Sequence, residues 1–165
     1  MNKDPQGLEI DLDRSFQEKM WVVERIGWAL MFLIVVAALA GFTGVTGAAS
    51  SGRAEAAGAT IDYPRISRWQ TADTLAVDFA ESTAGKVEVL IPKAFTKVFA
   101  IDGVTPQPSK VTATPEGQLY EFELAAEAGK KTADFSIRAG RPSLPTQARG
   151  AVAGEPFAMP FIVLP

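Results

Sequence analysis

The chain has 165 residues, of which 47% are hydrophobic and 21% charged, with a net charge of −3 and neither cysteine nor histidine. Without thiolate or imidazole ligands, zinc, copper and iron–sulfur sites and the usual serine–histidine or cysteine–histidine catalytic pairs are not expected. The chain has no polybasic run that would suit nucleic acid, so we expect a protein that is not an enzyme and binds no metal, cofactor or nucleic acid.

Residues 1–20 are predicted to be a cytoplasmic leader followed by the start of an amphipathic helix. The helical pattern begins at Asp11, and either Asp11 or Asp13 suits the helix N-terminus. Apolar residues then recur every three or four positions, at Leu12, Phe16, Met20, Val23 and Gly27. One long helix that runs straight into the membrane fits this stripe; a solvated helical stub without a partner is the alternative.

The strongest feature is an uncharged run over residues 26–52, whose apolar part reads IGWALMFLIVVAALAGF. A helix rises about 1.5 Å per residue, so roughly 20 apolar residues cross a hydrocarbon core of about 30 Å. We therefore predict a transmembrane helix over residues 21–45. A cleavable signal peptide is the alternative, but the acidic leader and the length of the run favour an uncleaved anchor.

The cationic residues on either side of this run predict its orientation. Arg14, Lys19 and Arg25 precede it, whereas Arg53 alone follows within about 20 residues. Lysine and arginine are enriched on the cytoplasmic side of membrane helices. We therefore expect a cytoplasmic N-terminus, with the C-terminal part of the chain in the periplasm or outside the cell.

Four residues at the start of the span are candidate contact residues for the membrane interface or for a partner. Trp21, Arg25 and Trp28 share one helical face, and indole rings and arginine stems both suit the headgroup region. Glu24 is unusual there, because a carboxylate near hydrocarbon is costly and usually has a partner. Two interpretations remain open: a set of interface anchors, or a contact of Glu24 or Arg25 with another membrane subunit.

Small residues mark the end of the predicted span. Ala37 and Gly41 form a small-xxx-small pair, a spacing that lets two membrane helices approach closely, and both are candidate partner contacts. Residues 46–60 are rich in Gly, Ala, Ser and Thr. This composition predicts a flexible linker.

From residue 61 the hydrophobic period changes to two, which indicates strands. Eight segments are predicted as strands: residues 75–80, 87–91, 96–102, 109–114, 120–124, 133–138, 147–153 and 157–164. Seven or eight short strands separated by turn residues predict an immunoglobulin-like antiparallel β-sandwich over residues 61–165, with an open barrel as alternative. Pro160 predicts that the last strand is an edge or is bent there. We interpret it as a guard against unwanted pairing, and strand addition by a partner is the other interpretation.

The predicted domain offers no catalytic constellation. Glu121 and Glu123 are two positions apart on one strand and therefore share a face that we expect to be solvated. Four further residues, Tyr63, Arg65, Arg68 and Trp69, precede the first predicted strand. We expect them either to touch lipid headgroups or to cover the open end of the sandwich.

Residues 16–28 read FQEKMWVVERIGW. This block resembles the W-x-x-E-R-x-G-W juxtamembrane signature of an uncharacterised group of bacterial single-pass membrane proteins. The IDGVTPQP of residues 101–108 and the Phe-x-x-Leu-Pro at the end of the chain are similar to the outer domain of that group. Genes of the group often lie beside those of YetF-like multi-pass membrane proteins. The resemblance implies the bacterial inner membrane and a YetF-like partner, but it carries over no activity and no functional residues.

These observations predict a non-enzymatic, membrane-anchored accessory subunit or binding module of a larger inner-membrane assembly. Its expected partners are an integral membrane protein and the lipid bilayer. Two alternatives come from other classes: an extracytoplasmic assembly factor or chaperone that acts through a sheet edge, and an envelope domain that binds a ligand such as a sugar.

Overall fold

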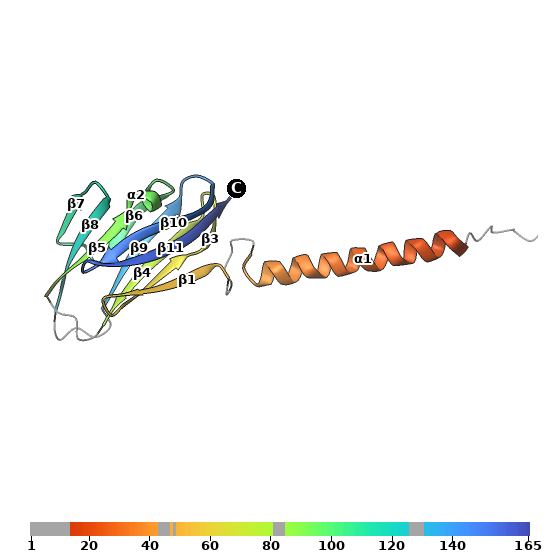
Figure 1. Ribbon diagram of the computed structural model, residues 1–165, viewed down its shortest axis with the longest axis horizontal. Coiled ribbons are helices and arrows are strands. Elements are labelled where there is room, and N and C mark those ends of the chain that lie inside the picture. Colours follow the sequence, from red (N-terminus) through yellow and green to blue (C-terminus); the bar gives the residue numbers. More distant parts are fainter. Residues whose placement is uncertain (1–13, 43–46, 48, 81–84, 126–130) are drawn as a thin grey trace, which may run out of the picture. The chain divides into compact units, whose positions relative to one another are not determined.

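A computed structural model describes residues 14–42, 47, 49–80, 85–125 and 131–165 of the chain. The chain divides into two compact units, Met1–Val36 and Ala37–Pro165. The first holds most of a long helix, and the second holds the end of that helix and a β-sandwich (Figure 1).

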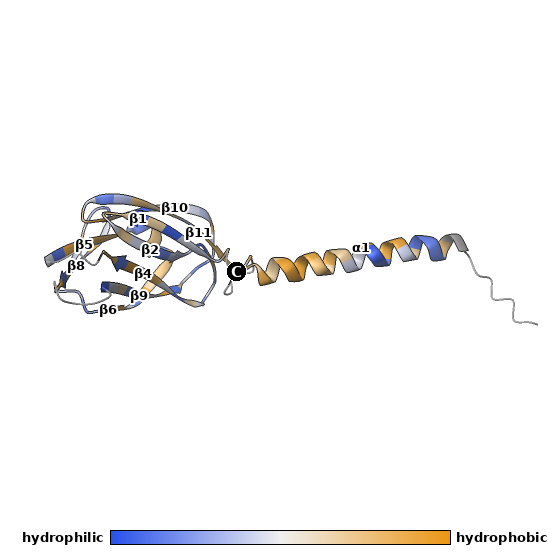
Figure 2. Cartoon of the chain, turned by 90° about the horizontal axis from the view of Figure 1, so that it is seen from below, coloured by the Kyte–Doolittle hydropathy of each residue, from blue (hydrophilic) through white to orange (hydrophobic). Residues whose placement is uncertain are grey.

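Helix α1 (Arg14–Leu39) is continuous over 26 residues, which confirms one long helix. Asp11 and Asp13, the predicted N-terminal residues of this helix, lie outside the described residues. The part from Phe16 to Leu39 is long and apolar enough to cross a membrane. No residue of its most apolar 18-residue stretch is buried within the protein. Figure 2 shows the C-terminal half of α1 as the most hydrophobic part, with hydrophilic residues gathered in its N-terminal half.

The predicted transmembrane helix over 21–45 is too long at its C-terminal end, because α1 ends at Leu39. Gly41 has a φ of 90°. Its N–H donates to the Ala38 carbonyl (3.0 Å), and the Phe42 N–H donates to the Ala37 carbonyl (3.1 Å). This pair of bonds is a Schellman motif, in which a glycine with positive φ ends the helix. Gly41 is therefore the helix cap.

The predicted linker over 46–60 is also wrong in part, because strands begin at Ser51. Strand β1 (Ser51–Ala56) pairs with β2 (Ala59–Pro64) around a turn in which Ala57 and Gly58 have φ values of 49° and 72°. Two positive φ values in a two-residue loop define a type I′ turn. The small residues that predict a flexible linker instead lie in a tightly packed hairpin. A Cβ on Gly52, for example, would lie 2.5 Å from the Tyr63 ring.

The remaining strands complete two stacked sheets. One sheet has the order β1-β2-β4-β9-β6 and the other β3-β11-β10-β5-β8-β7. Their bounds are β3 Ile66–Arg68, β4 Ala72–Phe79, β5 Gly85–Pro92, β6 Phe99–Thr105, β7 Lys110–Ala113, β8 Gly117–Leu124, β9 Lys131–Ala139, β10 Ser143–Val152 and β11 Glu155–Leu164, with the short helix α2, Lys93–Thr96, between β5 and β6.

The arrangement is an immunoglobulin-like sandwich, which confirms the predicted architecture. Strands β2, β4, β9 and β6 occupy the places of A, B, E and D, and β5, β10 and β11 those of C, F and G. The described residues form eleven strands instead of seven or eight, because β1 extends one sheet, β3 joins the other, and the β7–β8 hairpin is inserted before β9. Strand β3 pairs parallel to β11, so the sheets are not wholly antiparallel.

Phenylalanine side chains fill the space between the sheets. Phe95 of α2 stacks on Phe99 of β6 with ring centroids 4.6 Å apart, and Phe161 of β11 meets both rings edge-on at 5.5 and 5.4 Å. All three are at most 3% exposed. Helix α2 also explains why the strand predicted from residue 96 begins at Phe99: the chain turns to place Phe95 in the core.

Candidate functional site

Helix α1 brings the four predicted contact residues onto one side. Trp21, Glu24, Arg25 and Trp28 are three, four and seven positions apart, so they lie within one face of the helix. Trp21 and Trp28 are 55% and 63% exposed. The Arg25 guanidinium lies 3.9 Å from the centre of the Trp21 ring, a cation–π contact that directs its charge toward the helix N-terminus. The Arg25 charge therefore lies one turn further from the apolar half of the helix than its Cα.

Glu24 has no such arrangement. No ion pair or hydrogen bond of its side chain is found within residues 14–42 or the rest of the described chain. The uncharged part of α1, from Ile26 to Leu39, has about 14 residues and a length of about 21 Å, which is shorter than a hydrocarbon core of about 30 Å. A helix that ends at Leu39 and spans a bilayer therefore brings Glu24 to the edge of the hydrocarbon or into it.

The two small residues are not brought together as a helix-packing pair. Ala37 lies in α1, but Gly41 lies beyond its last residue and is buried. A Cβ on Gly47 would lie 2.5 Å from the Gly41 Cα. Gly41 thus allows a close approach between two parts of the chain's own backbone, and its use in contact with a partner helix stays a prediction.

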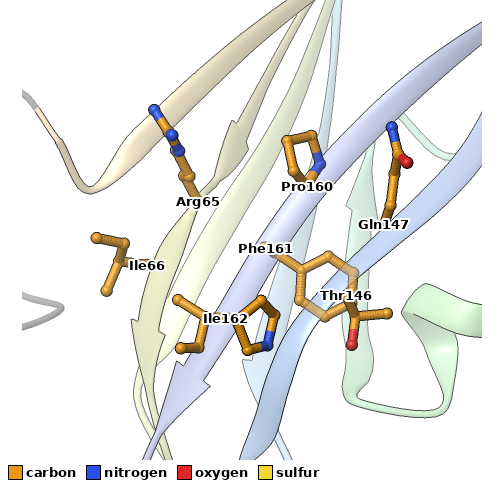
Figure 3. Close-up of a pocket in the computed structure, with 8 residues that line it drawn as sticks. Arg65, Ile66, Thr146, Gln147, Pro160, Phe161 and Ile162 are labelled. Atoms are coloured by element: carbon orange, nitrogen blue, oxygen red, sulfur yellow. The ribbon is translucent and has the colours of Figure 1, made fainter.

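The sandwich carries a groove of about 510 Å³ (Figure 3). Its floor is largely apolar, and Arg65 stands at one side. The groove lies where β10 is irregular between Ser143 and Thr146, beside the start of β3. Its lining residues are Arg65, Ile66, Pro145, Thr146, Gln147, Pro160, Phe161 and Ile162. This surface offers apolar contact area and no pair of carboxylates.

The outer edge of β11 is blocked by two prolines. The Ile162 N–H donates to the Arg65 carbonyl (2.9 Å), so even-numbered amides of β11 point away from β10. Pro156 and Pro160 are even-numbered too, so their backbone nitrogens also face away from β10. On this side β3 pairs only with Ile162–Leu164, and in the unpaired part of β11 each proline replaces an N–H donor. This geometry favours the guard interpretation of Pro160. The four-residue spacing of the prolines was the available sequence signal for it.

The carboxylates at the predicted solvated face form cross-strand ion pairs. Glu121 Oε1 lies 3.7 Å from Lys110 Nζ, and Glu123 Oε1 lies 4.0 Å from Lys86 Nζ. These are register partners on the outside of the sheet. Such pairs at a sheet surface contribute little to stability, and they do not resemble an acid–base dyad in a cleft.

A polar contact that the sequence did not reveal joins the two sheets. The buried Ser67 hydroxyl of β3 donates to Asp73 Oδ2 of β4. Burial raises the pKa of the Asp73 carboxyl above its ordinary value of 3.8, and the Ser67 hydrogen bond opposes that shift. The two residues are six apart on either side of a chain reversal, which sequence periodicity does not connect.

This carboxyl predicts a pH dependence of stability. Because the folded protein holds the Asp73 proton more tightly than the unfolded chain, its contribution to stability is fully present below pH 3.8 and is lost as the pH rises through the raised pKa. We expect Asp73→Asn to gain stability relative to the unsubstituted Asp73 chain as pH increases from 3.5 to 7, in urea unfolding followed by Trp69 fluorescence with Trp21 and Trp28 both replaced by phenylalanine. Ser67→Ala removes the hydrogen bond that opposes the raised pKa of Asp73, so the free energy of unfolding should fall more steeply with pH than in wild type. Equal slopes for wild type and Asp73→Asn would contradict this assignment.

Together, the fold and these surfaces define a candidate membrane-spanning or signal-anchor helix joined to an immunoglobulin-like β-sandwich. Within the described residues, no three Asp or Glu side chains gather as metal ligands. No family model matches the chain, and no curated protein matches it. The resemblance of the juxtamembrane block therefore stays a prediction.

Proposed function

We propose that the protein is a non-enzymatic accessory subunit or binding module of a larger bacterial inner-membrane assembly. Helix α1 anchors it with the N-terminus in the cytoplasm and the sandwich in the periplasm or outside the cell. The specific contact is made by the α1 face that carries Trp21, Glu24, Arg25 and Trp28. The partner is an integral membrane protein, and the resemblance of the juxtamembrane block favours a YetF-like multi-pass protein.

The observation that carries this proposal is the unpartnered Glu24 beside a short apolar stretch. Of the two adjacent charges, Arg25 is directed over Trp21, whereas Glu24 contacts no donor in the described part of the chain. A carboxylate near hydrocarbon is costly unless it is paired. A donor on a neighbouring membrane helix would supply that pairing and make the contact specific.

A sheet-edge chaperone is the less favoured alternative. Strand addition needs free backbone donors along an edge. Pro156 and Pro160 remove donors from the outward phase of β11, so this edge is a poor template for a client strand.

The proposal predicts that Glu24→Gln strongly reduces co-purification of a membrane partner. A hydrogen bond to a charged group is worth about 1.5–3 kcal/mol, which corresponds to roughly 10–100-fold in affinity. The tagged full chain would be extracted with its native lipids into polymer nanodiscs, and enriched proteins would be quantified by mass spectrometry. We expect one membrane protein to be enriched with wild type and reduced at least about tenfold with Glu24→Gln.

Glu18→Gln is the matched control, because Glu18 lies on the same helix and is also exposed. It should leave co-purification unchanged, and alkaline extraction should show equal membrane insertion of all three chains. A wild-type protein without any enriched membrane partner would refute the proposal. Retention of the same partner by Glu24→Gln would locate the contact elsewhere.

A further inference from the structure

One end of the sandwich is tied to the segment that leaves α1. The Ala49 N–H donates to the Ala40 carbonyl (3.0 Å), just beyond the last helical residue. The carbonyl of the next residue, Ser50, accepts from the Arg65 and Ile66 amides at 2.8 and 3.1 Å. Strand β1 therefore begins beside the start of β3, toward the end of the sandwich that holds the C-terminus (Figure 1).

Two large apolar side chains are exposed at this end. Trp69 is 49% exposed and Leu144 is 83% exposed. The Trp69 N–H donates to the Leu164 carbonyl (2.8 Å), and its indole Nε1 donates to the Gly140 carbonyl (3.2 Å). Leu144 follows Ser143, the register partner of Val163. Trp69 and Leu144 thus lie close to the end of β11, and Trp69 is held there by its hydrogen bonds.

Three arginines accompany these side chains: Arg65, Arg68 and Arg141. All three are exposed, and none forms an ion pair within the described part of the chain. Asp73, four positions after Trp69, accepts a hydrogen bond from Ser67, and Asp102 pairs with Arg138 at 3.0 Å. The Trp69 end (Arg65, Arg68, Trp69, Arg141 and Leu144) therefore combines unpaired positive charge with an exposed indole and an exposed leucine.

We propose that the Trp69 end docks on the anionic phospholipid headgroups of the leaflet from which α1 emerges. Indole rings favour the headgroup region, and each arginine near an anionic surface strengthens binding about fivefold. Ala49, just before β1, is hydrogen-bonded to Ala40, the residue that follows α1. The inference rests on the proposed membrane anchoring and extends it, because docking would restrict the orientation of the sandwich on the bilayer.

The test uses the full chain in nanodiscs of phosphatidylcholine with or without 30% phosphatidylglycerol. Trp21→Phe with Trp28→Phe leaves Trp69 as the single fluorophore, and lipids brominated near the headgroup serve as quencher. We expect Trp69 to be quenched in the anionic nanodiscs and to recover in 0.5 M salt, since salt screens the arginines. A second chain, with Trp28 as the single fluorophore, reports insertion of α1 independently.

The charge requirement is tested by Arg65→Gln, Arg68→Gln and Arg141→Gln in one chain, which should lower the docking constant by about 100-fold and abolish the quenching. Lys86→Gln, Lys110→Gln and Arg149→Gln remove the same charge from β5, β7 and β10 and should leave it unchanged. Quenched Trp28 with unquenched Trp69 would overturn docking but keep the anchor. An unquenched Trp28 would overturn the anchor itself. Trp69 shielded from iodide but not quenched by lipid would mean that a second copy covers it, and would also overturn docking.

Discussion

Replacing Phe161 by alanine should remove a large share of the free energy of unfolding of the sandwich. Its ring is 3% exposed and meets Phe95 and Phe99 edge-on, so its removal leaves a cavity between β11, α2 and β6. Truncation of a buried phenylalanine costs about 3–5 kcal/mol, a large share of the stability of a domain of this size. Urea unfolding of the full chain in nanodiscs, followed by Trp69 fluorescence with Trp21 and Trp28 replaced by phenylalanine, should show a matching fall in midpoint.

Val111→Ala is the matched control for this loss. Val111 lies in edge strand β7 and is 51% exposed. Its truncation should change the free energy of unfolding by less than about 0.5 kcal/mol. A Phe161→Ala protein as stable as Val111→Ala would show that the three rings do not pack as described.

Gly117→Ala is expected to be nearly as damaging, although it adds a single methyl group. A Cβ at this position would lie 2.0 Å from the Ile91 carbonyl oxygen and 2.8 Å from the Pro92 Cα. Both are backbone atoms of the paired strand β5, which cannot move without breaking the β5–β8 ladder. We expect a loss of about 3 kcal/mol, at the upper end for overpacking, measured by the same urea unfolding.

Gly103→Ala is a suitable comparison, because a Cβ there would meet nothing within 4 Å. Its free energy of unfolding should stay close to that of wild type. If Gly117→Ala were equally mild, the close approach of β8 to β5 would be incorrect.

Much of the fold could be predicted from hydrophobic period alone. The long apolar run predicted α1, and alternation at positions such as Tyr120, Phe122 and Leu124 predicted the strands from residue 75 onward. These patterns are local, and a buried face imposes them directly on the chain. On the helix, the same local spacing predicted that Trp21, Arg25 and Trp28 share a face.

The elements that were missed depend on contacts between distant residues. Strands β1 and β2 consist largely of small and polar residues. Their pairing depends on the turn at Ala57 and Gly58 and on contacts such as that of Gly52 with Tyr63. Strand β3 has three residues, too few to show a period, and forms because β11 offers it a partner. The end of α1 was placed too late because Gly41 is as compatible with a membrane helix as with a helix cap.

The sequence by itself determined the apolar helix, the charged and aromatic face at its start, and a β-rich remainder without cysteine or histidine, because composition and period are properties of the local chain. Only the tertiary structure decided which surfaces remain available. It showed that α1 ends at Leu39 with Gly41 as its cap, that Pro156 and Pro160 share the outward phase of one edge, and that the Trp69 amide is hydrogen-bonded to the end of β11. The last two depend on the pairing of strands, and a local pattern carries no information about which strand lies beside another.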